Sequence, residues 1–203
     1  MLELNVLELS WNKLTGGLPA ELSKCTHLSH LDLNNNHFSG PIPGWFGDFC
    51  GLGELKLSFN EYNGTITSWL GNCTSLLTLA LDNNKLWGSL PRQLGNLVSL
   101  NVLYLQKNNF SGLITSSINN CEKIYDLRHS YNSLTGSIPV EIGKIGNLQV
   151  MLDLSGKFLS GSIPFSLGDL MMLKVLNLSN NQLSGQVPDE IRDLRSLVEL
   201  NVS

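Results

Sequence analysis

The sequence is poor in charged residues and has no long apolar run. Only 15% of the 203 residues are charged, and the formal net charge is −4, which argues against nucleic acid or an anionic membrane surface as a partner. The apolar runs are far too short to span a bilayer. Met1 is followed at once by repeated sequence, without the charged and apolar regions of a secretion signal. We therefore expect no membrane insertion by this segment.

Motifs for catalysis and metal binding are also lacking. The chain contains no G-x-S-x-G, P-loop or H-E-x-x-H motif, and no cysteine or histidine cluster with zinc spacing. Cys25, Cys73 and Cys121 recur every 48 residues, a separation of roughly 10 Å in a stacked array, which is beyond disulfide reach. They should be small buried side chains, whereas Cys50 lies out of register. The sequence predicts a non-catalytic chain with no cofactor and no metal.

What the sequence does contain is a period of 24 residues with the pattern LxxLxLxxNxLxGxIPxxL. A fixed period of this length indicates a solenoid, and this consensus is that of a leucine-rich repeat. Nothing resembling a linker interrupts it, so we expect one domain over residues 1–203. It should hold about eight and a half repeats, uncapped at both ends, with apolar edges around Leu2 and Leu200. The repeats, numbered 1 to 9, open at Leu4, Leu28, Leu52, Leu76, Leu100, Ile124, Leu148, Leu173 and Leu197.

Each place in the repeat has a predicted structural role. The segment LxxLxLxx should form a strand whose first, fourth and sixth side chains point inward. Stacked strands then form a parallel sheet on the concave side, with short 3₁₀ or helical turns on the convex side. The predicted fold class is an α/β solenoid coiled as a right-handed superhelix. The LxGxIPxxL segment that follows the asparagine resembles the plant-specific subtype of leucine-rich repeat.

Asparagine and glycine mark the two turns of each repeat. The ninth place should form a ladder of buried amides, broken at Lys157. The thirteenth place is always glycine, which indicates a positive φ. Two irregularities are expected: a buried neutral His129 at an inward place, and a small bulge near Val150 in the 25-residue repeat 7. The ladder asparagines are Asn12, Asn36, Asn60, Asn84, Asn108, Asn132 and Asn181.

Candidate binding residues are sought on the strand face, because the repeat leaves the third, fifth, seventh and eighth places free. His30 on this face lies two residues from Asp32 and is interpreted as part of a surface pair. In repeats 3 to 6, aromatic and cationic residues form a strip of the kind that a peptide or protein site needs. An ordinary solvated surface is the alternative. The predicted ligand-binding residues are Lys56, Phe59, Tyr104, Lys107, Asp126, Arg128 and Tyr131.

Five N-x-S/T triplets favour a secreted lineage. A glycan on Asn177 or Asn201 would project from the strands and close the C-terminal end of the concave face. That would confine an elongated ligand to repeats 1 to 6. The predicted glycosylation sites are Asn63, Asn72, Asn109, Asn177 and Asn201.

The amino-acid sequence of the repeats resembles that of one family of plant receptors. "LDLNNNHFSGPIPGWFG", "GNLVSLNVLYLQKNNFSG" and "NSLTGSIPVEIGKIGNLQVMLDLS" are similar to the C-terminal ectodomain repeats of GASSHO-type receptor kinases, over essentially the whole chain. The resemblance implies an extracellular or apoplastic module at the plasma membrane. It would bind a secreted, often sulfated, peptide, and a co-receptor kinase would join near the C-terminal repeats.

The same resemblance bears on individual residues. It makes Lys56, Tyr104, Lys107, Arg128 and Tyr131 the peptide-side candidates. Related receptors hold the peptide carboxylate with paired arginines, but Tyr131 stands where a second basic residue would be expected beside Arg128. The receptors' N-terminal cap, transmembrane helix and Ser/Thr kinase domain are not in this sequence, which indicates an excised piece or a shortened relative.

Two other classes of function are compatible with this repeat. One is a stand-alone interaction or inhibitor protein, like the plant polygalacturonase inhibitors, which would bind a folded enzyme. The other is an ice-binding repeat protein, which would need a flat, regular row of Thr or Asn. Charges and aromatics break every such row here.

Overall fold

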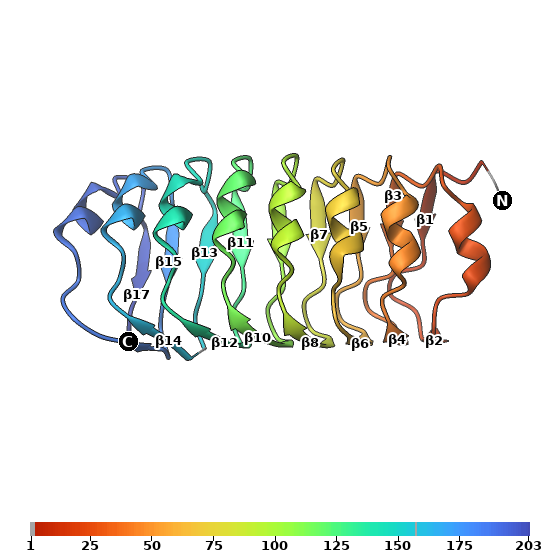
Figure 1. Ribbon diagram of the computed structural model, residues 1–203, viewed down its shortest axis with the longest axis horizontal. Helices are drawn as coiled ribbons and strands as arrows, with labels where there is room; N and C mark the ends of the chain where they lie inside the picture. Colours follow the sequence, from red (N-terminus) through yellow and green to blue (C-terminus); the bar gives the residue numbers. More distant parts are fainter. Residues whose placement is uncertain (1–2, 157) are drawn as a thin grey trace.

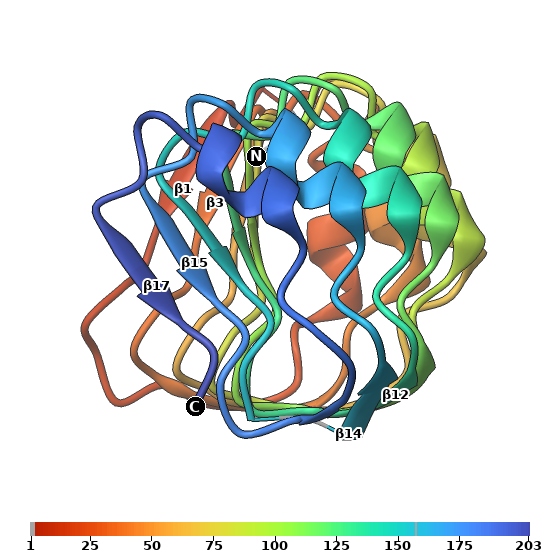
Figure 2. The same ribbon diagram turned by 90° about the vertical axis from the view of Figure 1, so that its left-hand side faces the viewer.

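The chain forms an extended stack of coils, one per repeat, with the two ends of the chain at opposite ends of the stack (Figure 1). The computed structural model describes residues 3–156 and 158–203. Each coil contacts its neighbours through two sheets and a line of 3₁₀ turns. Seen along the stack, the long sheet lies on one side and the turns on the opposite side (Figure 2).

The long sheet, called here the broad sheet, holds nine parallel strands in chain order. Its register advances by one repeat per strand, so that Lys56 pairs with Ala80 and Ala80 with Tyr104. In repeats 2 to 8 the inward places are buried as predicted; Leu52, Leu55 and Leu57 are each 0% exposed. In the terminal repeats they are less so, because Leu7 is only partly buried and Leu200 is 42% exposed. The strands are β1 (Val6–Glu8), β3 (His30–Asp32), β5 (Glu54–Lys56), β7 (Thr78–Ala80), β9 (Val102–Tyr104), β11 (Asp126–Arg128), β13 (Met151–Asp153), β15 (Val175–Asn177) and β17 (Glu199–Asn201).

A second parallel sheet of eight strands, which the repeat pattern did not predict, follows the ninth place of each complete repeat. Its inward residue is the one at the eleventh place, for example Phe38 and Tyr62, whose rings stack with centroids 6.2 Å apart. The strands are β2 (Thr15–Gly16), β4 (His37–Pro41), β6 (Glu61–Gly64), β8 (Lys85–Ser89), β10 (Asn109–Leu113), β12 (Ser133–Gly136), β14 (Phe158–Gly161) and β16 (Gln182–Leu183).

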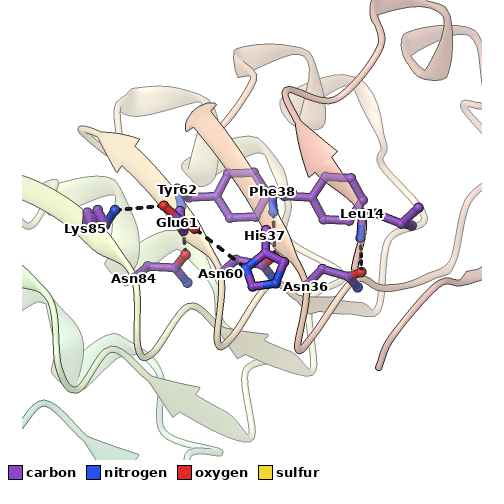
Figure 3. A network of polar contacts seen from close by, with 9 residues as sticks. All are labelled: Leu14, Asn36, His37, Phe38, Asn60, Glu61, Tyr62, Asn84 and Lys85. Atoms are coloured by element: carbon purple, nitrogen blue, oxygen red, sulfur yellow. Dashed lines mark hydrogen bonds and ion pairs between the residues drawn. The ribbon is translucent and has the colours of Figure 1, made fainter. Parts of the chain in front are cut away.

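The predicted asparagine ladder joins the two sheets (Figure 3). The Asn60 Oδ1 accepts the N–H of Phe38 at 3.0 Å, and its Nδ2 donates to the carbonyl oxygens of Leu33 at 2.9 Å and Leu57 at 3.2 Å. From Asn36 on, the ladder amides therefore satisfy backbone groups of their own coil and of the coil before. Lys157 and Leu2 lie outside the described residues.

The opposite side of each coil is a 3₁₀ turn that usually starts after a proline. Pro91 and Pro139, for example, have φ of −70° and −63°, which proline favours before such a turn. The turns pack closely, because a Cβ at Gly143 would lie 2.1 Å from the carbonyl oxygen of Ser166. They are η1 (Ala20–Lys24), η2 (Gly44–Asp48), η3 (Ser68–Asn72), η4 (Arg92–Asn96), η5 (Ser116–Asn120), η6 (Val140–Lys144), η7 (Phe165–Asp169) and η8 (Asp189–Asp193).

The irregular positions behave largely as expected. His129 is 1% exposed. The extra residue of repeat 7 lies at the entry to β13: the Gln149 N–H bonds the carbonyl of Tyr125, but Met151, and not Val150, is in register with Asp126. Cys25, Cys73 and Cys121 are buried thiols, and Cys50 is exposed. Burial raises the pKa of the Cys73 and Cys121 thiols to about 11, so these groups are inert side chains of the core.

Candidate ligand-binding face

The eighth place of each repeat forms a ridge beside the broad sheet, called here the eighth-place ridge. Its residues adopt left-handed backbone conformations, with φ between 50° and 62°. Each N–H donates to the seventh-place carbonyl of the next coil, as Phe59 does to Asp82 at 3.0 Å. The ridge residues are Trp11, Asn35, Phe59, Asn83, Lys107, Tyr131, Gly156 and Asn180.

Several ridge residues are poorly suited to this conformation. Asparagine and glycine adopt it readily, but for other L-residues it costs about 1–2 kcal/mol. Phe59 and Tyr131 nevertheless occupy it while 52% and 57% exposed, so core packing does not explain their presence. Strained, exposed aromatic residues are typical of functional surfaces.

The broad sheet is hollowed next to this ridge, at Ala80. Ala80 follows Lys56 and precedes Tyr104 in the register, and its short side chain leaves a gap of about 430 Å³ between their coils. Lys56, Phe59, Tyr104 and Lys107 surround this Ala80 hollow. The structure thus brings four of the seven predicted residues around one depression.

Tyr104, Asp126 and Arg128 form a tight cluster at the edge of the Ala80 hollow. The Asp126 carboxylate accepts bonds from Arg128 Nε at 2.9 Å and Nη2 at 2.7 Å, and from the Tyr104 hydroxyl at 2.7 Å. The Arg128 guanidinium also lies 4.8 Å from the centre of the Tyr104 ring. Burial, together with the bond to Asp126, raises the pKa of Tyr104 to about 12. These contacts hold both side chains in fixed orientations.

A second charged cluster flanks the Ala80 hollow on the N-terminal side. Glu54 lies beside the ammonium of Lys56 and 3.1 Å from His30 Nδ1, and Glu8 lies 3.3 Å from the other nitrogen of that imidazole. The hydrogen bond from Lys56 lowers the pKa of Glu54. His30 therefore pairs with glutamates of neighbouring coils, not with Asp32, whose carboxylate accepts the N–H of Asn34.

Tyr131 lies over the next coil. A Cβ at Gly156 would stand 3.0 Å from the ring atom Cδ1 of Tyr131, so the ring rests against a backbone that has no side chain. The glycine at this ridge position thus makes room for Tyr131.

The profile of the family described as Leucine Rich Repeat matches residues 3–25, 27–49, 75–97, 99–121 and 172–194, more than half of the chain. The chain belongs to the leucine-rich repeat family. The matched stretches fall in repeats 1, 2, 4, 5 and 8.

Plant receptor kinases are among the similar proteins. The ectodomain of GASSHO1/SCHENGEN3 from Arabidopsis thaliana, solved with CASPARIAN STRIP INTEGRITY FACTOR 2, is 51% identical with a TM-score of 0.98, over 99% of this chain and 24% of that one. Arabidopsis HAESA, solved with the peptide hormone IDA and the co-receptor SERK1, is 32% identical with a TM-score of 0.88, over 98% of this chain and 37% of that one.

A curated relative covers a shorter stretch. Receptor-like protein kinase 7 of Arabidopsis thaliana is 50% identical over 40 residues, which are 20% of this chain and 4% of that protein. The leucine-rich repeat chain therefore spans only a small part of the length of its receptor relatives.

One expectation about the leucine-rich repeat surface is wrong. The seventh place was predicted to be exposed, but Ser58, Asp82 and Ser130 are at most 5% exposed. These short side chains fold under the ridge, where the Ser58 hydroxyl bonds the Asp82 carboxylate at 2.5 Å. Asp126, at the third place, is 3% exposed because Tyr104 and Arg128 cover it. It supports the face and is not part of its accessible surface.

Other residues of the Ala80 hollow were missed by sequence reasoning. Thr78, Asn83 and Gln106 line it along with Ala80. The signal available in the sequence was the single small residue at a fifth place otherwise filled by large or polar side chains. Within the described residues, no helix is long and apolar enough to cross a membrane, and no three His, Cys, Asp or Glu side chains of that part of the chain are grouped to hold a metal ion.

Three of the sequon asparagines, Asn63, Asn72 and Asn109, are exposed on the second sheet and the η3 turn. Asn177 differs, because its Oδ1 accepts bonds from the N–H and the hydroxyl of Ser179, within its own triplet. Asn201 makes the same pair of bonds with Ser203. Both of these side chains lie on the broad sheet, beyond the coils that form the Ala80 hollow.

Proposed function

We propose that this chain is a non-catalytic, peptide-binding segment of a plant receptor-kinase type ectodomain. Its ligand is an extended secreted peptide that lies across strands β5 to β11. The observation that carries this proposal is the Ala80 hollow, which is framed by two aromatic and two basic side chains on a rigid sheet. Aromatic and basic anchors around a depression are what peptide recognition needs.

The dimensions of the face fit a short peptide segment. Strands β5 to β11 are three strand spacings apart, about 14 Å at roughly 4.8 Å each. An extended chain of four to five residues covers that distance. Tyr104 and Arg128 are already locked by Asp126, so binding loses little side-chain entropy at these contacts.

The relatives support the same proposal. GASSHO1/SCHENGEN3 was solved with CASPARIAN STRIP INTEGRITY FACTOR 2 and HAESA with the peptide hormone IDA, and the chain resembles their ectodomains over almost all of its length. By extension, we propose an extracellular or apoplastic location, glycans on the exposed sequons, and a co-receptor kinase near the C-terminal repeats. An ice-binding surface is disfavoured, because Lys56, Tyr104 and Arg128 interrupt any flat row on the broad sheet.

The test is calorimetric titration of the folded chain with a panel of synthetic secreted peptides, each made with and without tyrosine sulfate. Tyr104→Ala and Lys107→Ala should each weaken binding about tenfold, a typical loss for an anchoring contact. Trp87→Ala is the control, because Trp87 is 56% exposed on the second sheet. Binding of no peptide by the correctly folded chain, or equal losses with Trp87→Ala, would refute the proposal.

A further inference from the structure

We propose that the eighth-place ridge binds a polyproline II segment of the ligand through Trp11, Phe59 and Lys107. This inference rests on the proposed peptide-binding function and adds to it a ligand conformation. It also adds Trp11, which lies in repeat 1, outside the strip of repeats 3 to 6, as a specificity-determining residue.

Large and small residues alternate along the first five coils of the ridge. Trp11, Phe59 and Lys107 occupy coils 1, 3 and 5, and asparagines 35 and 83 occupy coils 2 and 4. Asparagine suits the left-handed conformation, whereas the three larger residues are strained in it. Trp11 is 81% exposed, so packing against the core does not account for a tryptophan at this position.

The spacing of the three large residues along the ridge matches the repeat length of a polyproline II helix. Every second coil is about 9.6 Å along the ridge, at roughly 4.8 Å per strand. A polyproline II helix repeats every three residues at about 3.1 Å per residue, so that one face returns every 9.3 Å. Residues i, i+3 and i+6 of such a ligand would face Trp11, Phe59 and Lys107 in turn.

A β-strand ligand does not fit the same three positions. It advances about 3.3 Å per residue, so the second contact would fall on residue i+3. In a strand, residue i+3 points to the side opposite residue i. A strand could therefore reach only two of the three ridge side chains with one face.

The charge of Lys107 determines which kind of ligand residue should face it. Lys56 is neutralised by Glu54, and Arg128 by Asp126. Among the ion pairs in the described part of the chain, none includes Lys107. The unpaired ammonium favours an acidic ligand residue there, and the two aromatic rings favour proline rings at the other two contacts.

The probes are capped nonapeptides in three hosts: all proline, alternating glycine and serine, and alternating threonine and valine. Each host carries one glutamate to face Lys107, placed at residue 7 for one direction of the peptide along the ridge and at residue 3 for the opposite direction. A version of each peptide with glutamine in place of the glutamate is the charge control. Binding is measured by calorimetry, and Trp11 is followed by intrinsic fluorescence against Trp11→Phe.

We expect the better proline peptide to bind about tenfold more tightly than either other host. Trp11→Ala and Phe59→Ala should each weaken it about fivefold, and Lys107→Ala should remove the preference for glutamate over glutamine. Trp87 and Phe158 are aromatic residues of the second sheet, about as exposed as Phe59. Replacing either of them with alanine should leave the affinity for the proline peptide unchanged.

Two results would overturn the inference: equal affinity for the three hosts, or an unchanged affinity with Trp11→Ala. If secreted peptides bind but proline peptides have no advantage, the polyproline II inference fails and the proposed peptide-binding function stands. If the folded chain binds no peptide of any kind, both fail.

Discussion

Arg128 holds the carboxylate of Asp126 through two bonds, Nε to Oδ1 at 2.9 Å and Nη2 to Oδ2 at 2.7 Å. Arg128, the one basic residue at the place where related receptors hold a peptide carboxylate with paired arginines, thus already has a buried carboxylate of its own. We propose that Arg128 positions the Tyr104 ring, which its guanidinium stacks against at 4.8 Å, and does not itself bind an anionic ligand group. Free positive charge on the face comes from Lys107 instead.

Asp126→Asn should loosen this cluster. It removes the buried partner of a guanidinium, at an expected cost of about 2 kcal/mol in the free energy of unfolding. It should also lower the pKa of Tyr104 from about 12 without restoring its ordinary value, because burial is the larger cause of the shift. Spectrophotometric titration, assigned with Tyr104→Phe, measures this pKa.

Asp153→Asn is the matched control for that substitution. Asp153 lies one coil on, in register with Arg128. Within the described residues its carboxylate accepts hydrogen bonds from Ser155 of its own coil, and its charge acts on Arg128 without a hydrogen bond. We expect it to cost less than 1 kcal/mol. A Tyr104 pKa unchanged by Asp126→Asn would show that the hydrogen bond contributes nothing to the cluster.

Asn60→Ala should be among the most destabilising changes in the ladder. It leaves the buried Phe38 N–H without its acceptor and removes the shorter of the two amide bonds to the Leu33 carbonyl, which keeps Asn36 Nδ2 at 3.2 Å. We therefore expect a loss of about 2–3 kcal/mol. Asn12→Ala, where the amide bonds only carbonyls of its own coil, should cost less than 1 kcal/mol. Urea denaturation of both variants compares them, and equal losses would contradict the ladder's role.

The Glu54 cluster predicts an acid dependence of stability. Lys56 lowers the pKa of Glu54 in the folded chain below the ordinary value of 4.5, so the folded state releases this proton more readily than the unfolded state. The stabilisation is therefore present above pH 4.5 and is lost as the pH falls through the folded-state pKa. Unfolding measured from pH 6 to pH 3 should show Glu54→Gln less sensitive to acid than the unmodified chain.

Glu122→Gln, an exposed substitution in repeat 5, serves as the control for that series. It should leave the acid limb of the stability curve in place. If Glu54→Gln and the unmodified chain lose stability in parallel as the pH falls, Glu54 is not responsible for the acid limb.

Trp11→Asn should stabilise the fold while weakening the ligand contact. The side chain is 81% exposed, so little burial is lost, and asparagine relieves the left-handed backbone at φ 57°. We expect a gain of about 0.5–1 kcal/mol. Hydrogen exchange in coils 1 and 2 measures this locally, and a loss of protection there would mean that the indole stabilises the coil.

Much of the fold could be predicted because the same environment recurs every 24 residues. The inward leucines, the asparagine ladder and the positive φ of the thirteenth-place glycines all follow from a single repeat. The second sheet was missed, because its short strands are recognisable only once the Asn60 amide is seen to join them to the next coil.

The binding face was only partly predictable for a related reason. Strand alternation identified Lys56, Tyr104 and Arg128, but the burial of Asp126 depends on a hydroxyl donated from the coil before. The Ala80 hollow exists because a side chain is small where its neighbours are large. The left-handed ridge, in turn, places Phe59 and Tyr131 where no propensity argument would put them.

Comparison of Phe59→Ala with Phe158→Ala tests the central claim most directly. The two rings are 52% and 54% exposed, one on the ridge and one on the second sheet, so they differ in place and not in exposure. Calorimetric titration with a peptide that binds the unmodified chain should give about fivefold weaker affinity for Phe59→Ala and no change for Phe158→Ala. Equal affinities for the two variants would contradict a ligand site on the broad-sheet face.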